Sequence, residues 1–174
     1  QSQNKFRAYK NTTINAGYPC DFTLYQYVEG TGGTEPGGGD PEPEPGESPI
    51  ADGDQVVIYN PAYGKALSGE YSGFYNIGTD VTMDGDTLTG YTDADVWSVI
   101  DNGDGTWSFS YEGQNIGMQE SYSSMPLGAV NDQWTLEDAG EGLYYIKNTV
   151  RSAYMEYQDN YGTWSAYHTI ASGS

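Results

Sequence analysis

The chain has 174 residues, of which 25 are acidic and 6 are basic, so its formal net charge at pH 7 is -19. A nucleic-acid-binding protein needs basic groups to neutralise phosphates, and a surface this acidic repels DNA, RNA and anionic lipid. No apolar run of about 18 residues is present to insert into a membrane, and the single cysteine, Cys20, excludes an internal disulfide and a cluster of thiolate ligands. The aromatic content of 14% nevertheless predicts a buried core.

Residues 1–29 form the first segment, which contains two stretches of alternating apolar and polar residues. These stretches, residues 4–10 and 21–28, are typical of β-strands. The chain opens at Gln1 without a basic or apolar leader, so we expect either that a signal peptide has been removed or that the chain is a piece of a longer one. Few lysines and many Gly, Tyr, Asn and Ser residues favour a secreted or cell-surface β-protein.

Residues 30–49 form a linker. This stretch holds 7 Gly and 5 Pro residues and has no aliphatic or aromatic side chain, so it has nothing to bury. Its prolines and its acidic residues both favour an extended chain. We expect a reach of about 60 Å when it is fully extended and roughly 25 Å as a flexible coil. The acidic residues are Glu35, Asp40, Glu42, Glu44 and Glu47.

Residues 50–174 form the body, and they contain internal repeats. Residues 96–109 align without a gap with residues 133–146 at an offset of 37, and a third copy at an offset of 88 places Ile58 under Ile146. Each copy reads as strand, glycine-containing turn and strand, because aromatic and β-branched residues alternate with polar ones. No stretch shows sustained helical periodicity, so the prediction is an all-β fold.

The repeats resemble the β-trefoil, and the resemblance covers residues 52–170. Residues 60–67 and the Gln133-Trp134 pair, which opens a strand, are similar to the ricin-type version of that fold. The Gln-x-Trp spacing of ricin-type lectins is replaced here by Gln133-Trp134 and Val96-Trp97, so their sugar-pocket residues do not transfer. The body also resembles the trefoil-like modules of large cell-surface hydrolases of anaerobic Gram-positive bacteria, which implies an accessory, non-catalytic role.

A fold with three copies requires three strands of the Trp type. Trp97 and Trp134 open two of them, and the offset of 37 places the third near residue 171, where the sequence stops. The stretch at residues 4–10 is the expected third strand of the Trp type, and the stretch at 21–28 is a second alternating strand after it. Written after residues 167–174, the two restore a continuous third repeat. The prediction is therefore an all-β, trefoil-like fold in permuted register, in which residues 1–29 complete the body of residues 50–174.

This completion has three interpretations that the sequence leaves open. The leading strands fold back onto their own body, which has an expected diameter of about 30 to 40 Å; or they insert into the next subunit and build a head-to-tail filament; or they are the tail of a preceding module in a tandem array. Two strands alone are marginal in water, and the body alone leaves an unpaired edge. The side chains expected to be buried at the joint are Phe6, Tyr9, Phe22, Leu24 and Tyr27.

The sequence predicts no catalytic residue and no cofactor. His168 is the single histidine and has no matching serine elbow or cysteine partner, which argues against a nucleophilic triad. Asp101 and Asp104 imitate the start of a calcium loop, but the distal Glu of an EF-hand is absent, and a hairpin turn is the favoured interpretation. The pair Asp93 and Asp95 is likewise interpreted as solvated surface carboxylates.

Two classes of function remain. The first is a non-enzymatic extracellular module that assembles with itself, or with adjacent modules of a larger protein, by strand complementation. The alternative is a carbohydrate-binding accessory module, because aromatic side chains lie in the Gly- and Ser-rich excursions between strands and could stack on sugar rings. Phe74 is one of these aromatics, and the candidates for stacking are Tyr63, Tyr71, Tyr75, Tyr122, Tyr161 and Trp164.

Overall fold

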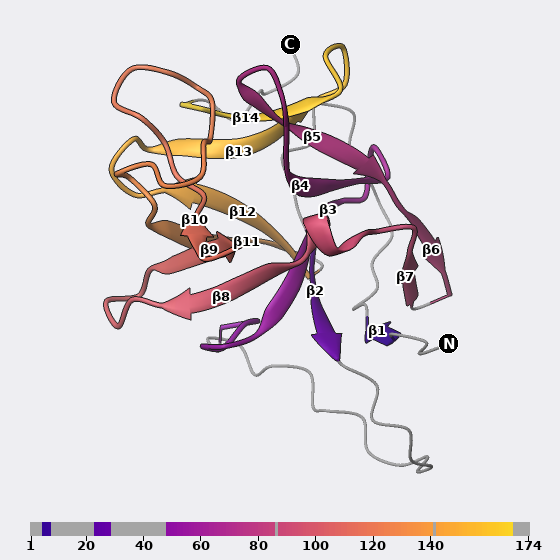
Figure 1. The fold of residues 1–174 in the computed structure, drawn as a ribbon. Helices are drawn as coiled ribbons and strands as arrows, with labels where there is room; N and C mark the ends of the chain where they lie inside the picture. Colours follow the sequence, from indigo (N-terminus) through magenta and orange to yellow (C-terminus); the bar gives the residue numbers. More distant parts are fainter. Residues whose placement is uncertain (1–4, 8–22, 29–47, 86, 141, 169–174) are drawn as a thin grey trace.

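The computed structural model describes residues 5–7, 23–28, 48–85, 87–140 and 142–168, and the regular secondary structure within them is almost entirely β-strand (Figure 1). The exception is a short 3-10 helix, η1 (Asp93–Asp95). No helix within these ranges is long and apolar enough to cross a membrane. The strands are β1 (Lys5–Arg7), β2 (Thr23–Val28), β3 (Gln55–Asn60), β4 (Lys65–Ser72), β5 (Tyr75–Asp80), β6 (Thr82–Asp84), β7 (Thr87–Thr89), β8 (Trp97–Asp101), β9 (Trp107–Tyr111), β10 (Gln114–Asn115), β11 (Trp134–Gly140), β12 (Leu143–Asn148), β13 (Ala153–Gln158) and β14 (Thr163–Tyr167).

Six strands form a ring. β2 pairs antiparallel with β3, β3 with β8, β8 with β9, β9 with β11 and β11 with β12, and β12 lies against β2. Each repeat contributes the two strands at its ends: β3 and β8 in the first, β9 and β11 in the second, β12 and β2 in the third. A strand from the start of the chain therefore occupies the last place in the third repeat.

The three repeats bury matching side chains inside the ring. Ile58 in β3, Phe109 in β9 and Ile146 in β12 are each 0% exposed, and they stand at the repeat offsets seen in the sequence. Alternation along each strand turns these residues to the same side of the sheet. Since a fully buried large apolar side chain contributes about 1.5–3 kcal/mol, this shared layer is a major source of the fold's stability.

Two tryptophans fix the strands that end the first and second repeats. Trp97 in β8 and Trp134 in β11 are 0% exposed, and the indole Nε1 of each donates a hydrogen bond to a backbone carbonyl. The acceptors are the carbonyl oxygens of Leu67 at 2.9 Å and Ile116 at 3.0 Å. A buried indole N–H without an acceptor would cost about 1–3 kcal/mol, so these bonds hold β8 and β11 in place.

Between its two ring strands each repeat sends out an excursion, and the three excursions together form a cap. They are the β4–β5 hairpin, the loop of residues 116–133 and the β13–β14 hairpin, which lie in the upper part of Figure 1. β5 pairs with β14, and the backbone N–H of Ala166 in β14 donates to the carbonyl of Ser123 at 2.8 Å. The cap is thus one connected surface to which all three repeats contribute.

Asp95 in η1 corrects one sequence prediction, since it is 0% exposed and not a solvated surface carboxylate. Its carboxylate accepts hydrogen bonds from Thr79 Oγ1 at 2.6 Å and from Thr92 N at 2.7 Å and Oγ1 at 3.0 Å. These donors satisfy the buried charge and tie η1 to β5. The prediction was wrong because burial at this position comes from the packing of β4 against η1, which the local sequence does not reveal.

Candidate functional site

The sixth place in the ring, between β3 and β12, is the first candidate site, and we call it the strand slot. β2 fills it in a register that repeats the other two units: Leu24 faces Ile58, as Val99 faces Phe109 and Leu136 faces Ile146. Trp97 and Trp134 stand two residues before Val99 and Leu136, and Phe22 stands two residues before Leu24.

This register corrects the expected assignment of the third Trp-type strand. The strand of that type is β2 (Thr23–Val28). β1 (Lys5–Arg7), within the stretch at 4–10, pairs with the edge of β2 that lies opposite β3. Sequence alternation could not separate the two strands, because both have the period of a half-buried strand. Of the residues expected at the joint, Phe6 lies in β1, Leu24 and Tyr27 lie in β2, and Tyr9 and Phe22 lie outside the described residues.

The connection from β2 to β3 differs from its two counterparts. β8 leads into β9 through residues 102–106, and β11 leads into β12 through residues 141–142. Residues 29–54 separate β2 from β3, although the paired strands run side by side in the same way. The two shorter connectors show that a connector of this length is not needed to make the turn.

The burial of β3 requires that a strand fills the slot. Val56, Val57 and Ile58 of β3 are all 0% exposed, so this strand is buried on both faces. An empty slot would leave the backbone groups of β3 that face β2 without partners inside a hydrophobic environment, at about 1–3 kcal/mol for each unsatisfied group. Any segment that fills the slot is therefore held by main-chain hydrogen bonds as well as by apolar contacts.

The cap is the second candidate site, because each of its three excursions carries one highly exposed aromatic ring. Phe74 between β4 and β5 is 81% exposed, Tyr122 in the loop of residues 116–133 is 66% exposed, and Tyr161 between β13 and β14 is 79% exposed. Each of these rings has most of its apolar surface available for contact, so the three rings are candidates for ligand contacts. We call these three residues the cap aromatics.

The structure divides the aromatics that the sequence singled out for stacking. Tyr75, Tyr122 and Tyr161 are exposed, at 36% or more of their surface. Trp164 is 0% exposed and packs against Tyr157 in the core, which removes it from any surface site. Tyr63 is partly buried, with its ring centroid 5.4 Å from that of Tyr157.

Tyr71 has a structural part in the cap. Its hydroxyl accepts a hydrogen bond from the backbone N–H of Leu127 at 2.5 Å and donates one to the carbonyl of Met125 at 3.5 Å. Burial raises the pKa of this hydroxyl above its usual value, so it stays protonated as a donor. Tyr71 therefore joins the β4–β5 hairpin to the neighbouring loop.

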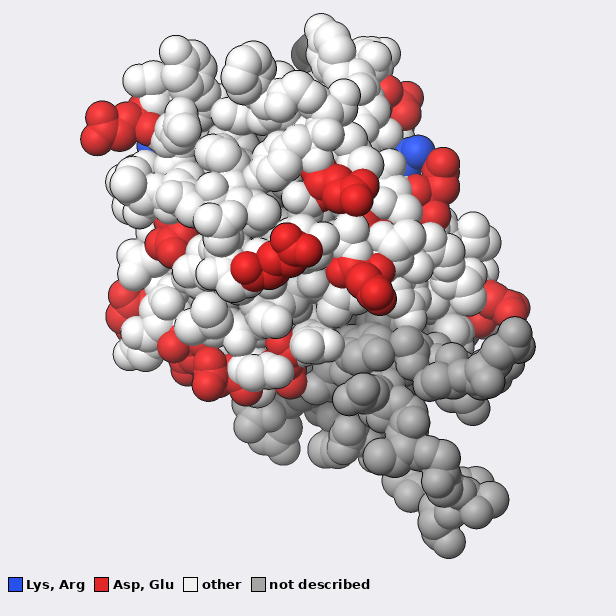
Figure 2. Space-filling view, in the orientation of Figure 1, with Lys and Arg blue, Asp and Glu red and all other residues white. Residues whose placement is uncertain are grey.

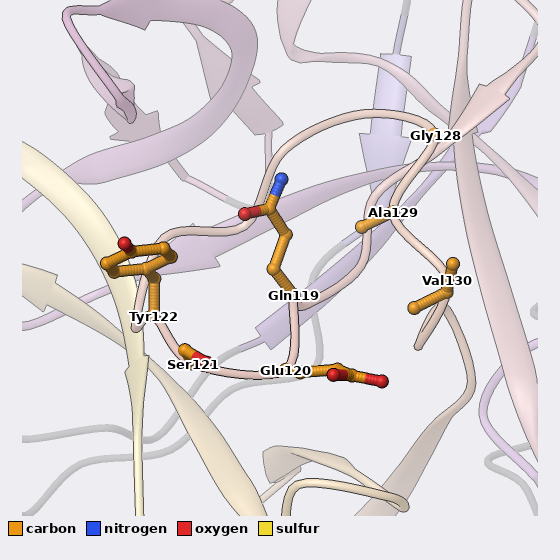
Figure 3. A pocket seen from close by; sticks show the side chains of 7 residues that line it. All are labelled: Gln119, Glu120, Ser121, Tyr122, Gly128, Ala129 and Val130. Atoms are coloured by element: carbon orange, nitrogen blue, oxygen red, sulfur yellow. The ribbon is translucent and has the colours of Figure 1, made fainter.

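A shallow open hollow of about 420 Å³ lies beside Tyr122. Figure 3 shows that its lining side chains come from two facing arms of one loop. An amide, a carboxylate, a hydroxyl and an aromatic ring thus face the same space, and these are groups that bind polyols. The lining residues are Gln119, Glu120, Ser121, Tyr122, Gly128, Ala129 and Val130.

Acidic side chains are spread over the face drawn in Figure 2, and each of the three excursions of the cap carries at least one exposed acidic residue, Glu70, Glu120 or Asp159. Lys65 and Lys147 each pair with a carboxylate, Asp80 at 2.6 Å and Glu137 at 3.1 Å. The face drawn in Figure 2 is therefore negative, and the cap carries acidic groups as well, which disfavours anionic ligands.

The candidate calcium carboxylates serve as turn caps. Asp101 Oδ1 accepts a hydrogen bond from Gly103 N at 2.8 Å, and Asp104 Oδ1 accepts from Thr106 N at 3.0 Å and Oγ1 at 2.6 Å. The bonds from Thr106 lower the pKa of the Asp104 carboxyl. Across the described ranges, no group of three or more His, Cys, Asp and Glu side chains is arranged to hold a metal ion.

Comparison with known proteins now bears on the fold. No family model and no curated protein matches the chain. Among solved structures it is similar to the crystal structure of a designed 3-fold symmetric protein, ThreeFoil, with a TM-score of 0.54 and 18% identity over 68% of this chain and 91% of that chain. The chain has a β-trefoil-like fold. This confirms the all-β, trefoil-like prediction, and at this identity the likeness concerns the fold alone.

Proposed function

We propose that the chain is a non-enzymatic structural module of the cell exterior that joins to further copies of itself through the strand slot. In this proposal β2 of one chain fills the slot of the next, so that the contact runs head to tail and continues into a filament. The observation that carries the proposal is the connector of residues 29–54, which replaces a tight turn at this one place in the ring.

The backbone pairs that hold β2 are the same whether the strand comes from its own chain or from a neighbour. The choice depends on the effective concentration of the tethered strand, which is on the order of millimolar for a short flexible linker and falls as the linker becomes longer or stiffer. The composition of residues 40–45, alternating prolines and acidic residues, favours an extended linker, and extension lowers that concentration. Extension therefore favours exchange between chains when the protein is concentrated at a surface.

Light scattering after size-exclusion chromatography tests the proposal. The wild-type chain is expected to shift from monomer to larger species as its concentration rises from micromolar to millimolar. The control replaces residues 27–55 with residues 102–106, Asn-Gly-Asp-Gly-Thr, because Gln26 pairs with Val56 as Asp101 pairs with Trp107 in the β8–β9 hairpin. This control should stay monomeric, and a wild-type chain that stays monomeric throughout would overturn the proposal.

The cap aromatics support a second candidate function, the binding of neutral carbohydrate. Aromatic faces stack on the apolar faces of sugar rings, and the acidic groups of the cap do not repel an uncharged polyol. A glycan array compares the wild type with the variants Phe74→Ala, Tyr122→Ala and Tyr161→Ala, alone and combined. Loss of binding in the triple variant, with unchanged thermal stability, would support this function, and no binding by the wild type would count against it.

A further inference from the structure

Residues 5–28 contain two strands, and each matches a strand near the end of a trefoil repeat. The first match is with β14: Lys5-Phe6-Arg7-Ala8-Tyr9 aligns with Thr163-Trp164-Ser165-Ala166-Tyr167, with identical alanines and tyrosines and an aromatic ring in the second position. The second match is β2, which has the register of β8 and β11 in the ring.

The position of β14 explains why the first match is informative. In the third repeat Ala166 pairs with Met155, and in the first repeat Gly78 of β5 pairs with Leu67. All four residues stand at the repeat offset of 88, so β14 and β5 are the same element of the trefoil unit. This element carries a small residue at the paired position, and Ala8 provides one in the leading segment.

The two strands also follow each other in the order that a trefoil repeat requires. The small residue precedes the ring-strand aromatic by 19 positions in the first repeat, from Gly78 to Trp97, and by 14 positions from Ala8 to Phe22. In this structure β14 occupies the place of such a strand between β5 and β13, and β1 pairs with β2 instead. The chain thus holds two strands, β1 and β14, that match the β14 place of the third repeat, and its body has one such place.

We propose that residues 5–28 are a second copy of the module's own closing segment, and that the partner they fit is another copy of this trefoil. The Lys5–Arg7 strand would take the β14 place in the cap of that copy, and the Thr23–Val28 strand would take its ring slot. The linker then joins one trefoil to the next. The inference shares the strand slot with the proposed function, but it does not require exchange between separate chains.

A spliced chain tests the order of the two strands directly. Residues 1–47 and 168–174 are removed, and residues 10–28 are attached after Tyr167, so that β14 leads into β2 as β5 leads into β8. We expect a folded monomer whose melting temperature equals or exceeds that of the full chain. The same splice with Leu24→Asp is the control, and it should melt at a lower temperature. A splice that is unfolded, or no more stable than its control, would overturn the inference.

A second chimera tests the β14 match alone. Residues 163–167 of the full chain are replaced by Lys-Phe-Arg-Ala-Tyr, and the control inserts Lys-Ser-Arg-Ser-Tyr at the same place. The first chimera should keep a cooperative melt, because Phe occupies the buried place of Trp164, while the control should lose it. Equal loss in both would overturn the inference. If both chimeras fail while the wild type still forms concentration-dependent oligomers, the proposed function stands without it.

Discussion

The first two repeats and the third occupy equivalent places in the ring but are closed in different ways. Short turns close the first two, at residues 102–106 and 141–142, whereas residues 29–54 lie between the paired strands β2 and β3. The longer connection raises the entropy cost of closure by on the order of 1–2 kcal/mol. Fold symmetry therefore does not make the three joints equal, and the third is the one at which we propose that a strand is exchanged.

Removing the leading segment is expected to lower the stability of the fold more than any of the changes that follow. Without residues 1–47 the third repeat loses its ring strand, and at about 1.5–3 kcal/mol per large apolar side chain the loss approaches the whole stability of a small domain. The remaining body should show a weak, non-cooperative melt, and a peptide of residues 1–29 should restore it. A body that is fully stable and indifferent to the peptide would contradict the prediction.

Shortening one side chain of the strand in the slot is expected to have the second-largest effect on stability. Leu24→Ala should destabilise the chain by about 2–5 kcal/mol, because Leu24 faces the fully buried Ile58. Val99→Ala is the matched change in the first repeat, where Val99 faces Phe109. Urea unfolding measures both. In addition, Leu24→Ala made in the peptide of residues 1–29 should weaken its binding to the body that remains without residues 1–47, whereas Val99→Ala made in that body should not. Equal weakening by Val99→Ala would mean that the slot is not the binding site.

Phe22→Trp should make the third repeat resemble the other two in the hydrogen bond that holds its ring strand. The indoles of Trp97 and Trp134 donate hydrogen bonds to backbone carbonyls, which phenylalanine cannot do. If the third repeat offers the same kind of acceptor, the variant should gain about 0.5–1.5 kcal/mol in chemical unfolding. Phe22→Leu serves as the control and should lose stability, and a loss of similar size in both variants would contradict the expected equivalence.

The smallest effect concerns a buried carboxyl in the third repeat. Glu156 is 7% exposed, and burial raises the pKa of its carboxyl, while Ser68 is the residue at the matching offset in the first repeat. A carboxyl with a raised pKa in the folded state stabilises the fold at low pH, and that contribution is lost as the pH rises through the folded pKa. Glu156→Gln should therefore be more stable than the wild type at pH 7.

The same variant has a clear pH signature. Its advantage over the wild type should shrink as the pH falls toward the ordinary pKa of a glutamate, because the wild-type carboxyl then becomes protonated. Thermal melts between pH 4 and pH 8 measure this difference. An advantage that is constant over the whole range would show that Glu156 does not titrate in this way.

Several site residues could not be assigned from the sequence. The aromatics between strands look alike locally, yet Trp164 is in the core while Phe74, Tyr122 and Tyr161 are exposed. What separates them is their position in the excursion: the exposed rings lie between the strands of a hairpin or within the loop, and Trp164 lies inside a paired strand. The repeat offset of 88 places Gly73, and not Phe74, under Tyr161, so the repeats do not single out Phe74 either.

The sequence alone determined the all-β class and the threefold repeat. These follow from alternation and from the spacing of Trp97 and Trp134, which are local patterns that any strand of the fold must carry. Only the tertiary structure decided that β2 and not β1 fills the slot, and that Asp95 is buried. Both depend on which segments, distant in sequence, pack against one another. The alternation along a single strand does not indicate which strands lie beside it.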